Sequence, residues 1–159
     1  MLKDGTAVTC IGSEGGYVLG TKTLGKGRHF WQVRIEKMGS LGVIIGICSE
    51  AAHHSASARK HFGVSHVDRY ADGTKTGPLG IAGVSTLFES GNVLHVMMDT
   101  SASTMRKLTI KNLTKNIELC IDDPEQLPSQ AFLPFFKLLQ KDDFLEVKQI
   151  PQTLFGKRV

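Results

Sequence analysis

The stretch that decides the fold reads Gly25-Lys26-Gly27-Arg28-His29-Phe30-Trp31-Gln32-Val33-Arg34-Ile35 and contains the chain's single tryptophan. From Trp31 onward apolar and polar residues alternate, which is the period of a β-strand with one buried face and one wet face. We therefore expect Trp31, Val33 and Ile35 to point into a hydrophobic core. The two glycines upstream give the backbone the freedom to turn tightly into this strand.

Other strands are predicted along the whole chain. Residues 41–48 are almost wholly apolar, so we expect a strand covered on both faces. No window of about eleven residues or more has the 3.6-residue apolar spacing of a helix. Turn-forming residues separate the apolar segments, and Asp72-Gly73 is the expected tip of a hairpin. The pattern predicts an antiparallel β-sandwich. Its further strands are expected within residues 5–25 (two short strands joined by a turn), 62–64, 93–98, 107–111, 117–121, 132–139 and 144–150.

The 159 residues correspond to one domain of usual size, which can bury a core without staples such as disulfides. We expect a single domain over residues 1–159, with a core of about 5–150 and a C-terminal tail of 151–159. This tail is expected to fray or to continue into a longer chain. Three cysteines, Cys10, Cys48 and Cys120, form no C-x-x-C pair, which argues against a disulfide framework or a zinc ribbon and favours a reducing compartment.

Composition also limits the classes of partner. The first five residues contain no apolar signal region, and no apolar run approaches the roughly 20 residues of a membrane span, so we expect a cytoplasmic protein with no membrane partner. The chain has 19 basic and 15 acidic residues, which gives a net charge of +4, and the basic residues are scattered along the sequence. A nucleic-acid-binding protein would more often show a basic stripe with exposed aromatics, so no nucleic-acid partner is expected. We expect a monomer.

Motifs that suggest catalysis or metal binding lack the structural context they need. Residues 20–26 match the phosphate-binding G-x-x-x-x-G-K, but they lead into a strand rather than a helix, and Gly27 replaces the Ser or Thr that would hold magnesium. The cluster of His53, His54, His61 and His66 has none of the usual zinc spacings, so a solvated loop is favoured over a metal site. We expect no enzymatic activity, no cofactor and no metal. His95 lies in an apolar strand and is expected to be a hydrogen-bonded core histidine.

The same central stretch resembles a known family signature. His29-Phe30-Trp31-Gln32-Val33 is similar to the H-Y-W-E-V of the SPRY family. Three further segments follow in the family's order: Gly42-Val43-Ile44-Ile45-Gly46-Ile47 resembles W-x-V-G-V, Gly91-Asn92-Val93-Leu94-His95-Val96-Met97-Met98-Asp99 resembles G-D-V-I-G-V-x-L-D, and Leu133-Pro134-Phe135-Phe136 resembles L-Y-P-x-x. The resemblance covers about residues 5–150. The PRY half of longer relatives is absent from residues 1–24, so the chain resembles a plain SPRY domain.

The resemblance implies a concanavalin-like sandwich of two antiparallel sheets that has no activity of its own and binds a protein or peptide through loops at one end. Family members are often attached to ubiquitin-ligase, scaffold or channel proteins, which implies an adaptor role. In relatives the loop after the V-G-V strand and the loop before the final strand lie near one another. By position these loops are residues 51–61 and 140–143. The implied partner-binding residues are His53, His54, Arg59, Lys60, Gln140, Lys141 and Asp142.

Two alternatives to this interpretation remain. The basic and polar character of the two loops favours an acidic or polar partner segment, but charge on a merely solvated loop is the default state of a surface. A lectin-like sandwich that binds glycans would share the same general shape. Sugar sites need acidic and amide side chains beside an exposed aromatic platform, whereas these loops offer His, Ser, Lys and Arg.

Overall fold

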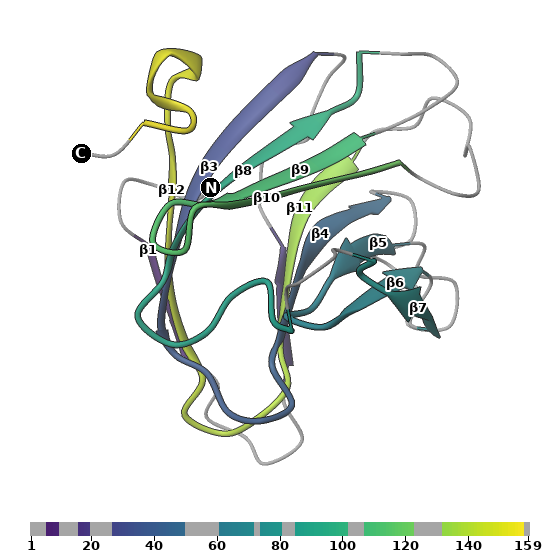
Figure 1. The fold of residues 1–159 in the computed structure, drawn as a ribbon, viewed down its shortest axis with the longest axis vertical. Coiled ribbons are helices and arrows are strands. Elements are labelled where there is room, and N and C mark those ends of the chain that lie inside the picture. The colour runs from purple at the N-terminus through teal and green to yellow at the C-terminus, as the bar shows by residue number, and fades with distance from the viewer. Residues whose placement is uncertain are drawn as a thin grey trace.

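The structure is a computed structural model that describes residues 6–9, 16–19, 27–49, 61–71, 74–80, 85–101, 107–122 and 132–157. These residues form two six-stranded antiparallel sheets, which Figure 1 shows as two layers. The all-β antiparallel sandwich expected from the sequence is therefore confirmed.

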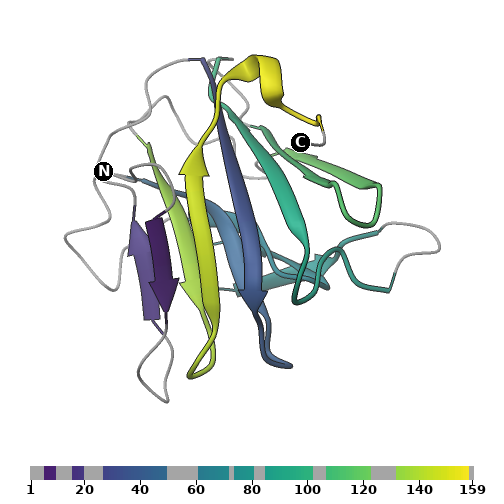
Figure 2. The same ribbon diagram turned by 90° about the vertical axis from the view of Figure 1, so that its left-hand side faces the viewer.

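Sheet A has the strand order β1-β12-β3-β8-β9-β10. Its strands are β1 (Thr6–Thr9), β12 (Phe144–Gln149), β3 (Arg28–Lys37), β8 (Val93–Asp99), β9 (Lys107–Asn112) and β10 (Ile117–Asp122). Sheet B has the order β2-β11-β4-β5-β6-β7. Its strands are β2 (Gly16–Leu19), β11 (Phe132–Leu138), β4 (Val43–Ser49), β5 (His61–Val64), β6 (Asp68–Ala71) and β7 (Thr74–Pro78). Figure 2 shows β12, β3 and β8 side by side in sheet A.

The hydrophobic core lies between the sheets. Trp31, Val33 and Ile35 are all buried in it, as the alternation along β3 predicts. Strand β4 is covered on both faces, also as predicted, because Ile45 belongs to the central core while Cys48 packs in a second cluster of buried apolar side chains. Burial raises the pKa of the Cys48 thiol to about 11, since the low-dielectric surroundings disfavour the thiolate.

Two short strands near the N-terminus form as expected, but they do not pair with each other. Strand β1 pairs with β12 in sheet A, and β2 pairs with β11 in sheet B. The chain therefore passes from one layer to the other between these two strands. On the other side of sheet B, Ala71 faces Thr74 across β6 and β7, so a two-residue connection joins these strands where the hairpin tip was expected; Asp72 and Gly73 themselves lie outside the described residues.

Strands β6 and β7 flank the expected hairpin tip, but their bounds and the apolar segment that follows them were not predicted from the sequence. Leu79, Leu87 and Phe88 lie outside any strand, yet all three are buried in the central core. Arg69 anchors the edge of sheet B because its Nη2 donates a hydrogen bond to the Leu79 carbonyl at 2.9 Å. Pro78 ends β7 at this edge of the sheet, where its missing N–H costs no inner ladder bond.

The C-terminal tail is folded through Lys157. Ile150 N–H donates to the Phe30 carbonyl at 3.1 Å and so extends the pairing of β12 with β3. A short 3₁₀ helix, η2 (Gln152–Leu154), follows, and the Phe155 ring then packs against Phe30 with centroids 5.2 Å apart. Residues 151–157 of the expected tail thus contain a 3₁₀ turn and an aromatic contact with sheet A. Within the described part of the chain, no helix is long and apolar enough to cross a membrane.

Candidate functional site

Turns from three parts of the chain meet at one end of the sandwich. Lys37 at the end of β3 faces Phe144 at the start of β12, and Leu138 at the end of β11 faces Val43 at the start of β4. The turns 38–42 and 139–143, each of which connects a strand of one sheet with a strand of the other, therefore lie side by side (Figure 2). The segment 85–92 joins them, because Gly91 N–H donates to the Ile35 carbonyl at 2.6 Å. We call these three segments the loop end.

A buried carboxylate joins the turns 38–42 and 139–143. Asp143 is only 1% exposed, and its Oδ1 accepts a hydrogen bond from Gly39 N–H at 2.8 Å. Its Oδ2 accepts from Gln140 N–H at 3.0 Å, within its own turn. Charge-assisted hydrogen bonds of this kind are stronger than neutral ones. Asp143 therefore closes one turn and fixes the other turn to it.

Two further polar side chains hold the turn 38–42 in place. The Gln140 Oε1 accepts a hydrogen bond from Leu41 N–H at 2.6 Å. The Ser90 hydroxyl accepts from Met38 N–H at 2.9 Å and donates to the Met38 carbonyl at 3.3 Å. Gly42, with φ of 81°, takes a left-handed conformation that favours glycine. These contacts set the backbone of a turn whose Leu41 side chain is 60% exposed.

The His66 side chain packs against the turn 38–42 at Gly42. A Cβ added to Gly42 would lie 2.2 Å from the His66 Nδ1, so the imidazole occupies the space that the glycine leaves. The Phe88 ring also lies near His66, with the centroids of the two rings 6.4 Å apart. Desolvation lowers the pKa of His66, and the negative charge of Asp68 only partly opposes this shift. The neutral imidazole is thus a packing element beneath the loop end.

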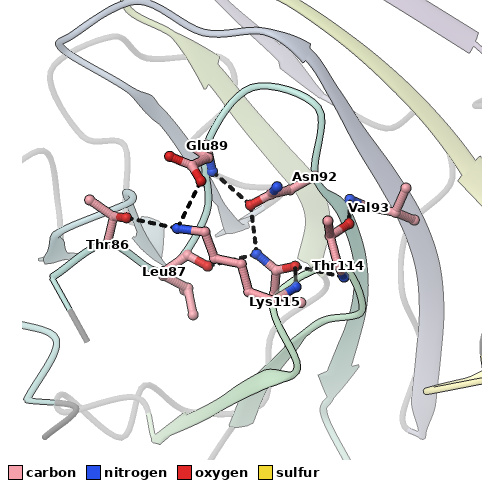
Figure 3. A network of polar contacts seen from close by, with 8 residues as sticks. Thr86, Leu87, Glu89, Asn92, Val93, Thr114 and Lys115 are labelled. Carbon is pink, nitrogen blue, oxygen red and sulfur yellow. Dashed lines mark hydrogen bonds and ion pairs between the residues drawn. The ribbon is translucent and has the colours of Figure 1, made fainter. Parts of the chain in front are cut away.

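A buried amide network fixes the segment 85–92 to the turn between β9 and β10 (Figure 3). Asn112 is 1% exposed, and its Nδ2 donates to the Leu87 carbonyl at 2.9 Å and to the Asn92 Oδ1 at 2.8 Å. On the surface, the Lys115 Nζ bonds the Thr86 hydroxyl at 3.0 Å and pairs with a Glu89 carboxylate oxygen at 3.2 Å. These contacts fix the position of segment 85–92, although the segment has no regular secondary structure.

The structure describes three of the seven predicted partner-binding residues. Gln140 is half-buried and holds the neighbouring turn, whereas Lys141 and Asp142 are exposed at the tip of theirs. Asp142 has a φ of 72°, a left-handed conformation that Asp tolerates better than most residues. His53, His54, Arg59 and Lys60 lie outside the described residues.

The expectation that both predicted loops emerge at the same end is wrong. Strand β11 pairs Phe132 with Ser49 and Leu138 with Val43. The turn 139–143 therefore begins beside the start of β4, while the chain leaves β4 toward residues 50–60 at the other end and returns to β5 at His61, opposite Cys48. The two anchors are separated by the length of β4, which is about 20 Å.

Two residues of the loop end were missed in the sequence. Leu41 was assigned to the buried strand, and its exposure follows from its position in the turn before β4. Asp143 was placed on the solvated turn, but its carboxylate faces inward. Across the described residues, no group of three or more His, Cys, Asp and Glu side chains is arranged to hold a metal ion.

The sequence matches no family model, and no curated protein matches it. The fold does match solved structures. The SPRY domain of human HERC1 has a TM-score of 0.64 and 15% identity, and the match covers 96% of this chain and 93% of that domain. A second human SPRY domain has a TM-score of 0.55 and 12% identity, with 92% and 93% covered.

Proteins of other classes share the sandwich. The carbohydrate-binding module CBM66 from Bacillus subtilis has a TM-score of 0.53 and 12% identity, and the match covers 91% of this chain and 89% of the module. Scytalido-glutamic peptidases match with TM-scores of 0.41 and 0.45, which are too low to carry an argument. The fold that the sequence resemblance implied is therefore confirmed, and the chain is a SPRY-like β-sandwich.

Proposed function

We propose that the chain is a non-catalytic protein-interaction module whose partner binds at the loop end. The observation that carries this proposal is the exposed Leu41, which stands on a turn held by Gln140, Asp143 and Ser90. Binding is more favourable when the contact residue is already ordered, because less conformational entropy is lost. Loops on a rigid β scaffold are also where binding residues concentrate.

The side chains at the loop end suggest the chemistry of the partner. Leu41 offers an apolar contact, and Lys141 and Asp142 offer one charge of each sign beside it. A partner segment with one apolar side chain flanked by polar groups fits this arrangement. Arg59, Lys60, His53 and His54 stay predicted contributors, and because β4 leads to them at the opposite end of sheet B, they would add a separate contact that favours acidic groups. In a longer cytoplasmic protein such a module would act as an adaptor, for instance by recruiting a substrate to a ubiquitin ligase.

Affinity capture tests the proposal. The whole chain serves as bait, and bound proteins are identified by mass spectrometry. Leu41→Asp and Lys141→Glu should each remove the specific partner while the fold is retained. Lys107→Glu is the matched control, because Lys107 is equally exposed but begins β9 at the opposite end of sheet A. A partner that Leu41→Asp still captures at the wild-type level would place the binding surface elsewhere.

Charge-dependent recognition is tested on the partner once it is captured. Binding should weaken with salt if Lys141, Arg59 and Lys60 contact acidic groups. The triple variant Arg59→Glu, Lys60→Glu, Lys141→Glu should fold normally and lose binding. If the triple variant binds as tightly as the wild type, the partner contacts neither of the two predicted loops.

Glycan binding is the second candidate, and the fold shared with the carbohydrate-binding module CBM66 favours it. Against it, the loop end has no exposed aromatic side chain among its described residues, since Phe88 is fully buried. Sugar rings usually stack on such an aromatic. A glycan array probed with the labelled chain separates the two functions: a specific glycan signal that Leu41→Asp leaves unchanged would favour the lectin-like alternative.

A further inference from the structure

A row of polar side chains crosses the outer face of sheet A. Gln32 is on the face of β3 opposite to the buried Trp31, and the strand register places it between Lys148 on β12 and His95 on β8. Lys111 on β9 is next to His95, and Glu118 on β10 is next to Lys111. The predicted hydrogen-bonded His95 is confirmed, because its Nε2 lies 3.2 Å from the Gln32 Oε1. His95 is nevertheless on the outer face of the sheet and is only 1% exposed.

The C-terminal segment lies against this row. The Phe155 ring stacks on the His95 imidazole at 6.2 Å between centroids and packs on Phe30 at 5.2 Å. The Lys111 ammonium lies 4.8 Å from the centre of the Phe155 ring, a cation–π contact. Gly156 N–H donates a hydrogen bond to the His95 Nδ1 at 2.9 Å. Figure 2 shows this segment curling over the end of sheet A.

The segment has features of a bound peptide rather than of a core element. Every described residue from 151 to 157 is exposed or only partly buried, and Leu154 is 40% exposed. Its hydrogen bonds within η2 are local, so they would persist if the segment moved as a unit. A segment with few buried contacts opens at low free-energy cost. Its described side-chain contacts with sheet A come from Phe155, and Gly156 adds the hydrogen bond to His95.

The contact between Gly156 and His95 requires one protonation state. A backbone N–H can only donate, so the His95 Nδ1 must be unprotonated, and the Nε2 carries the hydrogen and donates it to the Gln32 Oε1. A proton on Nδ1 would point directly at the Gly156 N–H. The two donors would repel each other, and Gly156 would have to leave.

The charges around His95 reinforce this requirement. Lys148 on β12 and Lys111 on β9 are both cationic, while Gln32 on β3 and the Phe155 ring are neutral. Burial lowers the pKa of His95, and the two lysines lower it further. The pKa of the docked state is thus below that of a released, solvated histidine. The C-terminal segment is therefore fully docked above the usual histidine pKa. Its docking weakens as the pH falls through the lowered pKa that His95 has in the docked state.

We propose that the outer face of sheet A carries a binding site for an aromatic–glycine segment, that residues 154–157 occupy this site in the same chain, and that protonation of His95 opens it. Phe30 and Lys111 hold the aromatic ring, and the His95 Nδ1 accepts the glycine N–H. Gly156 is favoured because its φ of 78° is left-handed and an added Cβ would approach the Lys111 Nζ to 3.1 Å. The site is separate from the loop end, so this proposal does not depend on the proposed function.

The first test is a pH titration of the isotopically labelled whole chain followed by NMR. Between about pH 7.5 and pH 5, the Gly156 amide and the Phe155 ring should lose their docked shifts as His95 protonates. His95→Asn places a non-titrating acceptor close to the Nδ1 position, so it should keep the docked shifts across this range. His29→Asn, on the same sheet, is the control and should titrate like the wild type. Docked Gly156 and Phe155 signals that persist after His95 is protonated would overturn the proposal.

The second test supplies the segment in trans. The probe is a synthetic peptide, Pro-Gln-Thr-Leu-Phe-Gly-Lys-Arg-Val, with the sequence of residues 151–159. It should bind the Phe155→Ala variant of the whole chain, shift the His95 and Lys111 signals, and bind about tenfold more weakly near pH 5 than near pH 7.5. Wild-type chain should bind it less tightly than the variant, because the tethered segment competes at high effective concentration.

A matched peptide with alanine in place of phenylalanine is the control for this experiment, and it should not bind. The variant must first show the circular dichroism and cooperative unfolding of the wild type. If the phenylalanine peptide causes no shift of His95 or Lys111 at millimolar concentration, or binds equally at both pH values, the proposed site does not exist as described.

Discussion

Replacing Asp143 by Asn tests whether one buried carboxylate holds the turns 38–42 and 139–143 together. The carboxylate accepts hydrogen bonds from Gly39 N–H at 2.8 Å and from Gln140 N–H at 3.0 Å. Asparagine keeps one acceptor oxygen, and its NH₂ group faces the second N–H. A hydrogen bond to a charged group contributes about 1.5 to 3 kcal/mol, and relief from burying the charge offsets part of the loss. We expect Asp143→Asn to lower the free energy of unfolding by about 2 kcal/mol.

Urea unfolding followed by tryptophan fluorescence measures this loss, because Trp31 is buried in the core. With a slope of about 2 kcal/mol per molar urea, the midpoint should fall by about 1 M. Asp142→Asn is the matched control, since it makes the same chemical change at the adjacent exposed residue, and Asn also tolerates the left-handed φ of 72°. The control should stay within about 0.5 kcal/mol of the wild type.

Hydrogen exchange supplies the local measurement. Loss of the Asp143 acceptor should speed exchange at the Gly39 amide, whereas the strand amides of β3 should respond only to the change in global stability. If Asp143→Asn and Asp142→Asn have equal stability and equal exchange at Gly39, the carboxylate does not order the loop end. Leu41 would then not stand on a turn that this carboxylate preorganises.

Three further predictions concern the core and the thiols. Trp31→Ala should cost about 3 to 5 kcal/mol in urea unfolding, whereas Leu41→Ala should change stability little because that side chain is 60% exposed. Iodoacetamide near neutral pH should modify the exposed Cys120 and leave Cys48 unmodified, because Cys48 is buried with a pKa of about 11; peptide mass mapping before and after unfolding checks this. Gly63→Ala should destabilise by about 1 to 3 kcal/mol, since its Cβ would lie 2.4 Å from the Ile45 carbonyl oxygen, and a wild-type melting temperature would contradict this.

The strands were predictable where packing imposes a period. The alternation of Trp31, Val33 and Ile35 reflects one buried face of β3, and the continuous apolar run of β4 reflects burial on both faces. Leu87 and Phe88 are equally buried, yet they lie in an irregular segment with no period. The Leu87 carbonyl accepts a hydrogen bond from Asn112, which is distant in the sequence. Such a contact leaves no local pattern.

The candidate site was predictable only in part because strand pairing is not written in the local sequence. The predicted loop 140–143 does lie between two strands, β11 and β12, although β11 ends one residue earlier than expected. Its position relative to residues 51–61 depends on β11 running antiparallel to β4, which brings the end of β11 to the start of β4. Once that pairing is known, a loop after β4 and a loop after β11 must leave from opposite ends. The inward direction of Asp143 likewise depends on Gly39, about a hundred residues away, and not on its own neighbours.

The loop end and the proposed binding site for residues 154–157 both involve strands β3 and β12, but they lie far apart along these strands. Strand β3 carries Gln32 at its middle and leads into Met38, a separation of about 20 Å. Effects of groups separated by more than about 10 Å with no shared partner are usually additive. Release of the C-terminal segment at His95 should therefore leave the hydrogen bonds of Asp143 and Gln140 intact. Partner binding at the loop end is then independent of the pH-dependent release of the C-terminal segment, and each proposal stands or fails by its own experiment.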